Sequence, residues 1–582
     1  MTLLHNPVLR GFAPDPSLVR VGDWYHVATS SFEWFPTIPI HRSRDLAHWE
    51  YAGHVRGAVP GDSLAGVPDS GGVWAPSLSW DGERFWVVYS IVRSVGTPYF
   101  DVDTYVSTAT GPAGEWAAPR RVASHGFDPA LYHAEDGRLW LLNLQNDCRP
   151  GGQRFAGIVA TELDRETLTP VGDTHLLLQH GRLVEGPKLL RREGWYYLVL
   201  AEGGTGFEHG VLVARSRALT GPYEVDERPL LTTRDDPTVP LQKAGHGELV
   251  QTPGGDWVLS HLAARPLHTV DGRRCPLGRE TAIQAVVWDG EGWPRLRDGG
   301  HHPAVEVDVR LHTVDLSPDR SDPAHTVGAP SYTGDGPAPT VDRPLHTPTS
   351  HPTATAPDSD PDSDPDCDPG SAPTPGSRLA WPWSTLRAYA DPSWADAATR
   401  PGWIRLRGRH GPESCWAHSL LAQRVTEHRA EAEVTVEARP GTFTQAAGLV
   451  LWYNTEAYLS LDLTWAEPEG EGQHGQQWRG GGRTVLSLVE REESGTRQVA
   501  AVDVDAGAPL TLGVTVEGAE ARFWYVRGGV RTPVGGPLDF SKLSDDHGSR
   551  LRFTGAMAGI HAVDLVDAAF TADFTGFRLT CR

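Results

Sequence analysis

The sequence predicts an all-β protein in which a five-bladed β-propeller is followed by a β-sandwich. Three observations predict this fold: a turn-and-strand pattern that recurs five times in roughly the first 300 residues, a proline-rich break in composition, and an alternation of polar and apolar residues after it. A chain of 582 residues is also too long for a single hydrophobic core. We therefore expect a propeller at 1–315, a disordered linker rich in Pro, Asp and Thr at 316–378, and a sandwich at 379–582.

The propeller prediction depends on two short markers that keep the same phase. One is a glycine followed by aromatic and β-branched residues, and it recurs at intervals of 60, 55, 57 and 61 residues. The other precedes each glycine, so each pair indicates a β-hairpin. A period near 58 residues accommodates the four strands of a propeller blade, whereas a pair of sandwiches would not space both markers so evenly. The glycines are Gly22, Gly82, Gly137, Gly194 and Gly255, and the preceding markers begin at Asp15, Ala75, Asp128, Gly186 and His246.

The preceding markers also predict which side chains meet at the centre of the propeller. The innermost strand of each blade lines the central axis, so residues at the start of these strands should gather at one mouth of that axis. Three carboxylates, a tryptophan and a histidine would then converge from five distant parts of the chain. The residues at these positions are Asp15, Trp74 with Ala75, Asp128, Glu185 and His246.

Such a group of carboxylates is suited to cleaving a glycosidic bond. One carboxylic acid protonates the leaving oxygen, and a second carboxyl group attacks the anomeric carbon or activates a water molecule. A third negative charge can raise the pKa of the acid, because like charges disfavour ionisation. An aspartate before a proline is also ordinary turn chemistry. The common phase of Asp15, Asp128 and Glu185 within the repeat favours the catalytic interpretation.

The break in composition predicts the linker. Residues 317–377 include 14 prolines mixed with Asp, Thr and Ser, and no Trp, Phe, Ile or Met. Such a segment cannot bury enough apolar surface to offset the entropy lost on ordering. After it, 430–437 alternates polar and apolar residues, and 447–453 is almost continuously apolar. Neither stretch has helical periodicity, so both indicate strands of a β-sandwich.

Composition excludes several classes of partner. The formal charge is −22, so nucleic acid is not an expected partner. No apolar stretch approaches the roughly 18 residues of a membrane span. The five cysteines are scattered without metal-ligand spacing, and the N-terminus shows no export signal, so we expect a cytoplasmic protein. Twenty-one tryptophans suit a partner with uncharged apolar faces, such as a sugar.

Six motifs carry a resemblance to a known family. In order they lie at 6–17, 29–36, 74–77, 184–187, 201–209 and 277–284, and they cover the catalytic half of the chain. With 401–408 and 553–557 in the second half, the chain resembles glycoside hydrolase family 43, in the bacterial β-xylosidase and α-L-arabinofuranosidase branch with a C-terminal concanavalin-like sandwich. The resemblance implies a five-bladed propeller and inversion at the anomeric carbon. It also implies that Asp15 is the general base, that Glu185 is the general acid, and that Asp128 tunes and orients this acid.

The resemblance further implies a set of substrate-binding residues, namely Phe32, Trp74, Asn146, His209, Arg279 and Met557. A loop of the sandwich domain would close one side of the pocket. Asn146 and Met557 stand where the family pattern has Trp and Phe, so the sugar preference between xylopyranose and arabinofuranose is left open. His246 matches an axial histidine near a bound Ca²⁺ or water, and a hydrogen-bonded core histidine is the alternative. No cofactor is required, and Ca²⁺ at the propeller axis is the one candidate metal.

We therefore expect an exo-acting inverting glycoside hydrolase that acts on short xylo- or arabino-oligosaccharides. Two alternatives stay open: a catalytically silent carbohydrate-binding protein with Trp74 as a stacking platform, and a scaffold in which the sandwich mediates association. Retention of three carboxylates and Arg279 favours the enzyme, because a lectin needs no acid and base. An oligosaccharide is the expected partner, with no nucleic acid and no membrane, and a homo-oligomer is left open.

Overall fold

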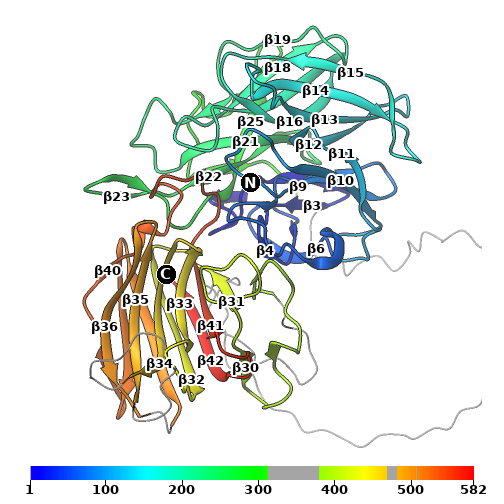
Figure 1. Ribbon diagram of the computed structural model, residues 1–582. Helices are drawn as coiled ribbons and strands as arrows, with labels where there is room; N and C mark the ends of the chain where they lie inside the picture. Colours follow the sequence, from blue (N-terminus) through cyan, green and yellow to red (C-terminus); the bar gives the residue numbers. More distant parts are fainter. Residues whose placement is uncertain (1, 312–378, 380, 468–481, 506–507) are drawn as a thin grey trace, which may run out of the picture.

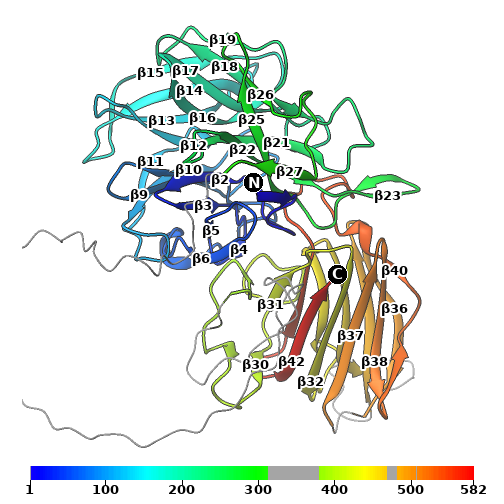
Figure 2. The ribbon, with the colours of Figure 1, turned by 180° about the vertical axis from the view of Figure 1, so that it is seen from behind.

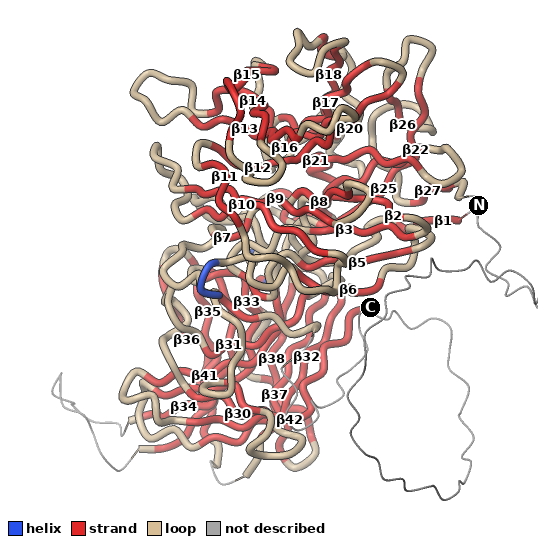
Figure 3. The backbone as a smooth tube through the Cα atoms, turned by 90° about the vertical axis from the view of Figure 1, so that its right-hand side faces the viewer, coloured by secondary structure: helices blue, strands red, loops and turns tan. Residues whose placement is uncertain are grey.

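The regular secondary structure of the protein consists almost entirely of β-strands, which loops and turns connect (Figure 3). The computed structural model describes residues 2–311, 379, 381–467, 482–505 and 508–582. Within these residues the only helical segments are the 3₁₀ turns η1 (Pro60–Asp62) and η3 (Phe540–Lys542). None of the described segments forms a helix that is long and apolar enough to cross a membrane. The predicted linker, 316–378, lies outside the described residues.

Five hairpins surround the axis of the N-terminal domain, as the repeat predicts. The inner strands are β2 (Ser17–Val21), β8 (Ser77–Trp80), β12 (Gly126–His133), β16 (Val184–Arg192) and β21 (Gln242–Gln251). Each pairs antiparallel with the next strand of its blade, which is β3 (Trp24–Ala28), β9 (Phe85–Val92), β13 (Leu139–Asn146), β17 (Trp195–Glu202) or β22 (Trp257–Ala264). Each inner strand also contacts the inner strands of both neighbouring blades, which closes a ring of five. The five-bladed propeller is confirmed.

Further strands complete each blade on the outside of the ring. They are β5 (Pro39–Ser43), β6 (Glu50–His54), β10 (Val102–Ala109), β11 (Arg120–Ala123), β14 (Phe155–Leu163), β15 (Pro170–Leu178), β18 (Gly210–Ser216), β19 (Glu224–Val225), β20 (Leu231–Thr232), β25 (Glu280–Trp288) and β26 (Pro294–Leu296). The short strand β7 (Gly72–Val73) instead pairs with β9 on the same edge as β8. The ends of the domain are tied together, because β1 (Thr2–His5) pairs antiparallel with β27 (Glu306–Val309). The hairpin β23 (Leu267–Thr269) and β24 (Gly272–Arg274) projects from the last blade beside the second domain (Figures 1 and 2).

Packing of blade on blade explains the continuous apolar runs of the repeat. All eight residues of β9 are buried, because one face packs on the preceding blade and the other on the following blade. Such strands do not alternate polar and apolar residues as strands with one solvated face do. The aromatic and β-branched runs after each glycine are therefore the cores between blades.

The second domain is a sandwich of two antiparallel sheets, which confirms the predicted fold class. One sheet contains β29 (Ala395–Asp396), β30 (Ile404–Arg407), β42 (Thr571–Cys581), β32 (Arg429–Ala438), β37 (Leu510–Glu517), β38 (Glu520–Arg527), β39 (Val530–Pro533) and β40 (Leu538–Asp539). The other contains β31 (Ser419–Arg424), β41 (Met557–Asp564), β33 (Gln445–Asn454), β34 (Ala457–Ala466), β35 (Arg483–Glu492) and β36 (Gly495–Asp503).

The two sandwich strands singled out in the sequence differ because one of them faces the propeller. In β32, buried and partly exposed residues alternate, as expected for a strand with one solvated face. In β33, Leu449 and Leu451 pack inside the sandwich, while Val450 and Trp452 on the opposite face join a cluster with Phe32 of the propeller. Docking of the two domains therefore accounts for the continuous apolar pattern of 447–453.

Buried ion pairs hold the two domains together. Arg387, which is fully buried, donates to Asp69 Oδ1 at 2.8 Å, and Thr455 of the sandwich donates to the other oxygen of the same carboxylate. Lys243 of the propeller is equally buried, and its Nζ lies 2.9 Å from Asp545 Oδ1. The cost of removing these charges from water is offset only in this docked arrangement, because each charge has its partner on the other domain.

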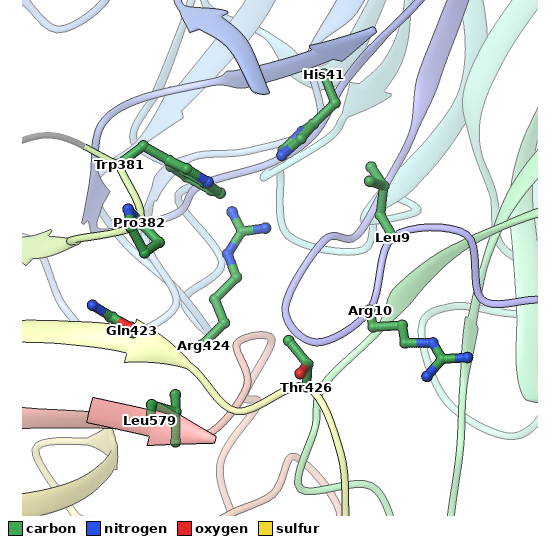
Figure 4. Close-up of a pocket in the computed structure, with 9 residues that line it drawn as sticks. All are labelled: Leu9, Arg10, His41, Trp381, Pro382, Gln423, Arg424, Thr426 and Leu579. Carbon is green, nitrogen blue, oxygen red and sulfur yellow. The ribbon is translucent and has the colours of Figure 1, made fainter. Parts of the chain in front are cut away.

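The first part of the predicted sandwich segment packs on the propeller. β28 (Thr385–Leu386) pairs with β4 (Trp34–Phe35), and the ring of Trp381 stacks on Tyr51 with 4.4 Å between centroids. Figure 4 shows a cavity at this boundary, lined by His41 of the propeller together with Trp381 and Arg424. The sandwich strands begin only at β29, so 381–388 belongs to the domain interface.

Candidate active site

A single cavity brings together every axial position that the repeat picks out. It lies where the mouth of the propeller axis meets the sandwich domain. Ten of its lining residues come from the propeller, and Phe553 comes from the sandwich. The cavity is lined by Asp15, Phe32, Trp74, Ala75, Phe127, Asp128, Glu185, Thr205, His246, Arg279 and Phe553.

Local breaks in the inner strands place the carboxylates at this cavity. Asp15, Asp128 and His246 have positive φ values of 56°, 51° and 50°, a backbone region that L-residues seldom occupy. The pairing register shifts between Phe127 and Ala130 in β12 and between Glu185 and Lys188 in β16. Such bulges bend a strand and re-aim its side chains, here toward the mouth of the axis.

Gly186 shows why the marker of the fourth blade contains a glycine. Its φ is +55°, and a Cβ at this position would come within 2.8 Å of His246 Nε2. Gly186 precedes the proline of its marker, as Asp15 and Asp128 do in their own blades, but this position of the fourth blade has no room for a side chain. The carboxylate comes instead from Glu185, one residue earlier.

Asp15 is surrounded by groups that favour its ionised form. Arg279 Nη1 donates to Asp15 Oδ1 at 3.1 Å, and Ser30 Oγ donates to Oδ2 at 2.5 Å. Burial opposes ionisation, but the positive charge of Arg279 and the hydrogen bond from Ser30 together hold the pKa of Asp15 below its ordinary value. Burial lowers the pKa of His246 to about 4, so this ring is neutral at pH 7 and Arg279 supplies the positive charge. Asp15 is therefore a carboxylate ready to accept a proton.

Glu185 is held in the opposite state. Burial, and then the negative charge of Asp15, raise the pKa of Glu185 to about 7. Burial also raises the pKa of Asp128 well above its ordinary value, and the charges of Glu185 and Asp15 add to this effect. Glu185 and Asp128 therefore form a pair that keeps a proton at a pH where an isolated carboxyl group has lost it. One carboxyl group with a lowered pKa, Asp15, beside another with a raised pKa, Glu185, is typical of the base and the acid of an active site.

A buried lysine lies deeper in the axis, and the sequence analysis missed it. Lys188 Nζ donates to Ser17 Oγ at 3.1 Å and to Ser77 Oγ at 2.7 Å, and it lies 3.4 Å from Glu248 Oε2. Four blades therefore meet at one ammonium group. A signal was present in the repeat, because all four residues occupy the third position of their markers.

The axial group is a poor donor set for Ca²⁺. This ion takes 6–8 oxygen ligands. Next to His246 the axis instead holds the ammonium of Lys188, which is close enough for its charge to lower the pKa of the histidine. A second cation would be repelled at this position. Occupancy by Ca²⁺ stays an untested prediction, and no step of the mechanism below depends on it.

Aromatic rings form the wall of the cavity. Phe553 stacks on Phe32 with 5.7 Å between centroids and meets Trp74 edge to face at 5.5 Å. The backbone of Phe553 is fixed as well, because its N–H donates to Ser70 Oγ and its carbonyl accepts from Arg279 Nη2, both at 3.0 Å. The sandwich thus supplies one wall and anchors the arginine that contacts Asp15.

Phe127 is a further wall residue that the sequence analysis missed. Its ring meets that of Trp74 edge to face, with 5.2 Å between centroids. It directly precedes Asp128 as Trp74 precedes Ala75, so its place in the repeat could have identified it.

Three predicted substrate-binding residues do not line this cavity. Met557 is 1% exposed and packs behind the wall in the cluster that contains Phe32 and Phe553. The aromatic ring that we expected to be lost at position 557 is supplied by Phe553, four residues earlier.

The other two are Asn146 and His209. Asn146 ends β13 and is absent from the lining residues, and His209 is buried with its ring against Gly245. Burial lowers the pKa of His209 to about 3, so its ring is neutral at pH 7.

We expect Phe553→Ala to raise KM more than it lowers kcat. The substitution removes a flat ring on which a sugar could stack but leaves the carboxylates in place, and one such aromatic contact is worth about 0.5–1.5 kcal/mol, or roughly 2- to 10-fold in affinity. Steady-state kinetics on a nitrophenyl glycoside would measure both constants. Phe443→Ala is the matched control, because Phe443 is 66% exposed in the same domain. Equal KM values for the two variants would contradict a wall role for Phe553.

Comparison with known families finds two matches that together span most of the chain. Residues 4–294 match the family model for glycosyl hydrolases family 43. Residues 375–580 match the model for the β-xylosidase C-terminal concanavalin A-like domain. The first match covers the propeller and its cavity, and the second covers the sandwich.

Individual relatives match over nearly their whole length. A protein of Humicola insolens named xylosidase/arabinosidase 43B is 35% identical over 99% of this chain and 97% of its own. A β-xylosidase of Bacillus subtilis is 33% identical over 98% of each chain. Among solved structures, xylan β-1,4-xylosidase from Bacillus halodurans superposes with a TM-score of 0.84 at 36% identity, over 99% of this chain and 100% of that one.

Proposed function

The chain belongs to glycosyl hydrolases family 43, and on this premise we propose that it removes one terminal pentose, β-xylosyl or α-L-arabinofuranosyl, from short oligosaccharides with inversion. The observation that carries the proposal is the cavity in which an ionised Asp15 and a protonated Glu185 face the same small space. Two carboxyl groups in opposite protonation states are the minimum that hydrolysis of a glycoside requires.

The reaction would proceed in one displacement. Glu185 donates its proton to the glycosidic oxygen as the bond between that oxygen and the anomeric carbon breaks. A water molecule attacks the anomeric carbon from the opposite face, and Asp15 accepts the proton that this water loses. Both carboxyl groups end with their protonation states exchanged, and proton transfer through solvent restores them. Arg279 keeps Asp15 ionised before the step, and its own position is fixed by the carbonyl of Phe553.

Asp128 would act on the acid. Its carboxyl group is buried beside Glu185, and its pKa rises with the charge on Glu185. The pKa of Asp128 is raised well above its ordinary value, so this carboxyl group keeps its proton, and the ionised Asp15 supplies the negative charge that opposes ionisation of Glu185. This repulsion helps to keep the catalytic proton on Glu185 until the leaving oxygen takes it.

The shape of the cavity supports attack at a chain end. The aromatic wall includes Phe553 from the sandwich, so the second domain closes a side that an internal segment of a polymer would need to cross. Stacking on flat rings suits the apolar face of a pentose. The names of the relatives include both xylosidase and arabinosidase, so both sugars are candidates.

Hydrolysis of nitrophenyl β-D-xyloside and nitrophenyl α-L-arabinofuranoside by one purified sample would test the proposal. We expect turnover of at least one, together with release of single pentoses from xylo- or arabino-oligosaccharides. Binding of the sugars without hydrolysis would show a catalytically silent carbohydrate-binding protein. Neither binding nor hydrolysis would favour a scaffold and overturn the assignment.

The pKa values predict the pH dependence of kcat/KM. Glu185 must be protonated to act as the acid, and its pKa is about 7, so kcat/KM should fall as the pH rises through about 7. Asp15 must be ionised, and its pKa lies below the ordinary value of 3.8, so activity should persist down to the pH at which the protein unfolds or this carboxylate is protonated. A pH profile of kcat/KM would show both limbs. An alkaline limb near pH 4.5, the ordinary value for glutamate, would contradict the raised pKa.

A further inference from the structure

A second group of potential ligand side chains lies on the propeller, outside the cavity. Asp235 follows β20 in the fourth blade, and His301 and His302 lie between β26 and β27 near the end of the domain. His301 Nε2 is 2.8 Å from Asp235 Oδ2, and His302 Nε2 is 2.9 Å from Asp235 Oδ1. The candidate ligand atoms of all three residues lie within 4.8 Å of one another.

The geometry of the group resembles one side of a metal coordination sphere. The two imidazole rings are nearly perpendicular, with 4.6 Å between centroids, and each presents one nitrogen to a different oxygen of the same carboxylate. Ligands at about 2.0–2.2 Å from an ion and at right angles to each other are about 2.8–3.1 Å apart. The nitrogen-to-oxygen distances fall in this range, so an ion could replace the shared protons with little movement of the side chains.

The chemistry of the ligands narrows the choice of ion. Two imidazole nitrogens and a carboxylate suit divalent d-block cations rather than Ca²⁺ or Mg²⁺, which prefer oxygen. The three side chains are one-third to one-half exposed, so water can complete the coordination.

We propose that Asp235, His301 and His302 form a binding site for a divalent d-block cation that fastens the closing segment of the propeller to its fourth blade. The backbone already joins these two parts at one point, because Thr232 N–H donates to His301 O at 2.9 Å. The histidines lead directly to β27, which pairs with β1 and closes the ring. An ion bound here therefore stabilises ring closure and takes no part in hydrolysis.

The test uses the full-length, untagged, chelator-treated protein and Ni²⁺ as the probe. Calorimetric titration should show one bound equivalent that is lost in both His302→Ala and Asp235→Asn. Thermal unfolding should show a rise in Tm with Ni²⁺ in the wild-type protein and none in these two variants, because a ligand that binds only the folded state stabilises it. His268→Ala is the matched control, because His268 is an exposed histidine on β23 of the same domain. This variant should still bind one equivalent of Ni²⁺.

Two results would overturn the site. One is the same number of Ni²⁺ equivalents in wild type, His302→Ala and Asp235→Asn, which would place the ion on other histidines. The other is no binding by the wild-type protein, which would mean that the three side chains only share hydrogen bonds. All three substitutions lie at exposed or partly exposed positions, so the variants are expected to fold.

Discussion

Replacing Glu185 by alanine should lower kcat for a natural disaccharide by about 10²–10⁴-fold or more. The substitution removes the proton that the leaving sugar oxygen needs, and no other carboxyl group takes its place. The decrease in kcat should be much smaller for a nitrophenyl glycoside, because nitrophenolate is a good leaving group that needs little protonation. Steady-state kinetics with both kinds of substrate would measure the two losses.

The matched control for this variant is Glu208→Ala. Glu208 lies on the adjoining loop, and its side chain is 69% exposed. We expect wild-type kinetics from this variant on both substrates. If Glu185→Ala lowered kcat equally for the nitrophenyl glycoside and the disaccharide, the role of Glu185 as the acid would be contradicted. The decrease in kcat would then not depend on the leaving group.

Replacing Asp15 by alanine should abolish turnover of natural and activated substrates alike. Every substrate needs a water molecule that loses a proton, so a better leaving group does not relieve the loss of the base. We expect a decrease of about 10²–10⁴-fold or more in kcat on both kinds of substrate. The contrast with Glu185→Ala distinguishes the two roles.

Asp15→Ala also leaves the buried Arg279 without its carboxylate, so its effect on folding needs a separate measurement. Asp15→Asn keeps the shape of the side chain and removes the base, and it should be equally inactive. Asp23→Ala, in an exposed turn of the same blade, is the control. A folded Asp15→Asn enzyme with undiminished turnover of a disaccharide would show that another group activates the water.

The phase of the repeat made the propeller and most of the cavity predictable. A residue one position before the proline or glycine of each marker lies at the mouth of the axis because the same strand geometry recurs in each blade, and Asp15, Asp128 and His246 share a backbone conformation as a result. Glu185 lies one residue before the corresponding position of the fourth blade, because Gly186 occupies that position. The repeat therefore placed Glu185 at the mouth of the axis, and the family pattern supplied its role as the acid.

Features set by contacts between domains were harder to predict. The placement of Phe553 rather than Met557 at the wall depends on how the sandwich docks, with Phe553 held between Ser70 and Arg279 of the propeller. No local periodicity encodes such a contact. Lys188 was missed for another reason: a buried lysine is rare, and the serines that satisfy its ammonium lie more than 100 residues away in the chain.

Proton NMR of the first sugar released from a β-xyloside, or from an α-L-arabinofuranoside if that is the better substrate, tests the central claim most directly. Direct attack by a water that Asp15 activates inverts the anomeric carbon. The account therefore predicts that α-xylose appears first from the β-xyloside, or β-arabinose from the α-arabinofuranoside, and that the other anomer grows in only by mutarotation. Initial release of the anomer with retained configuration would require a covalent sugar–enzyme intermediate and would contradict the assignment of Asp15 as a general base.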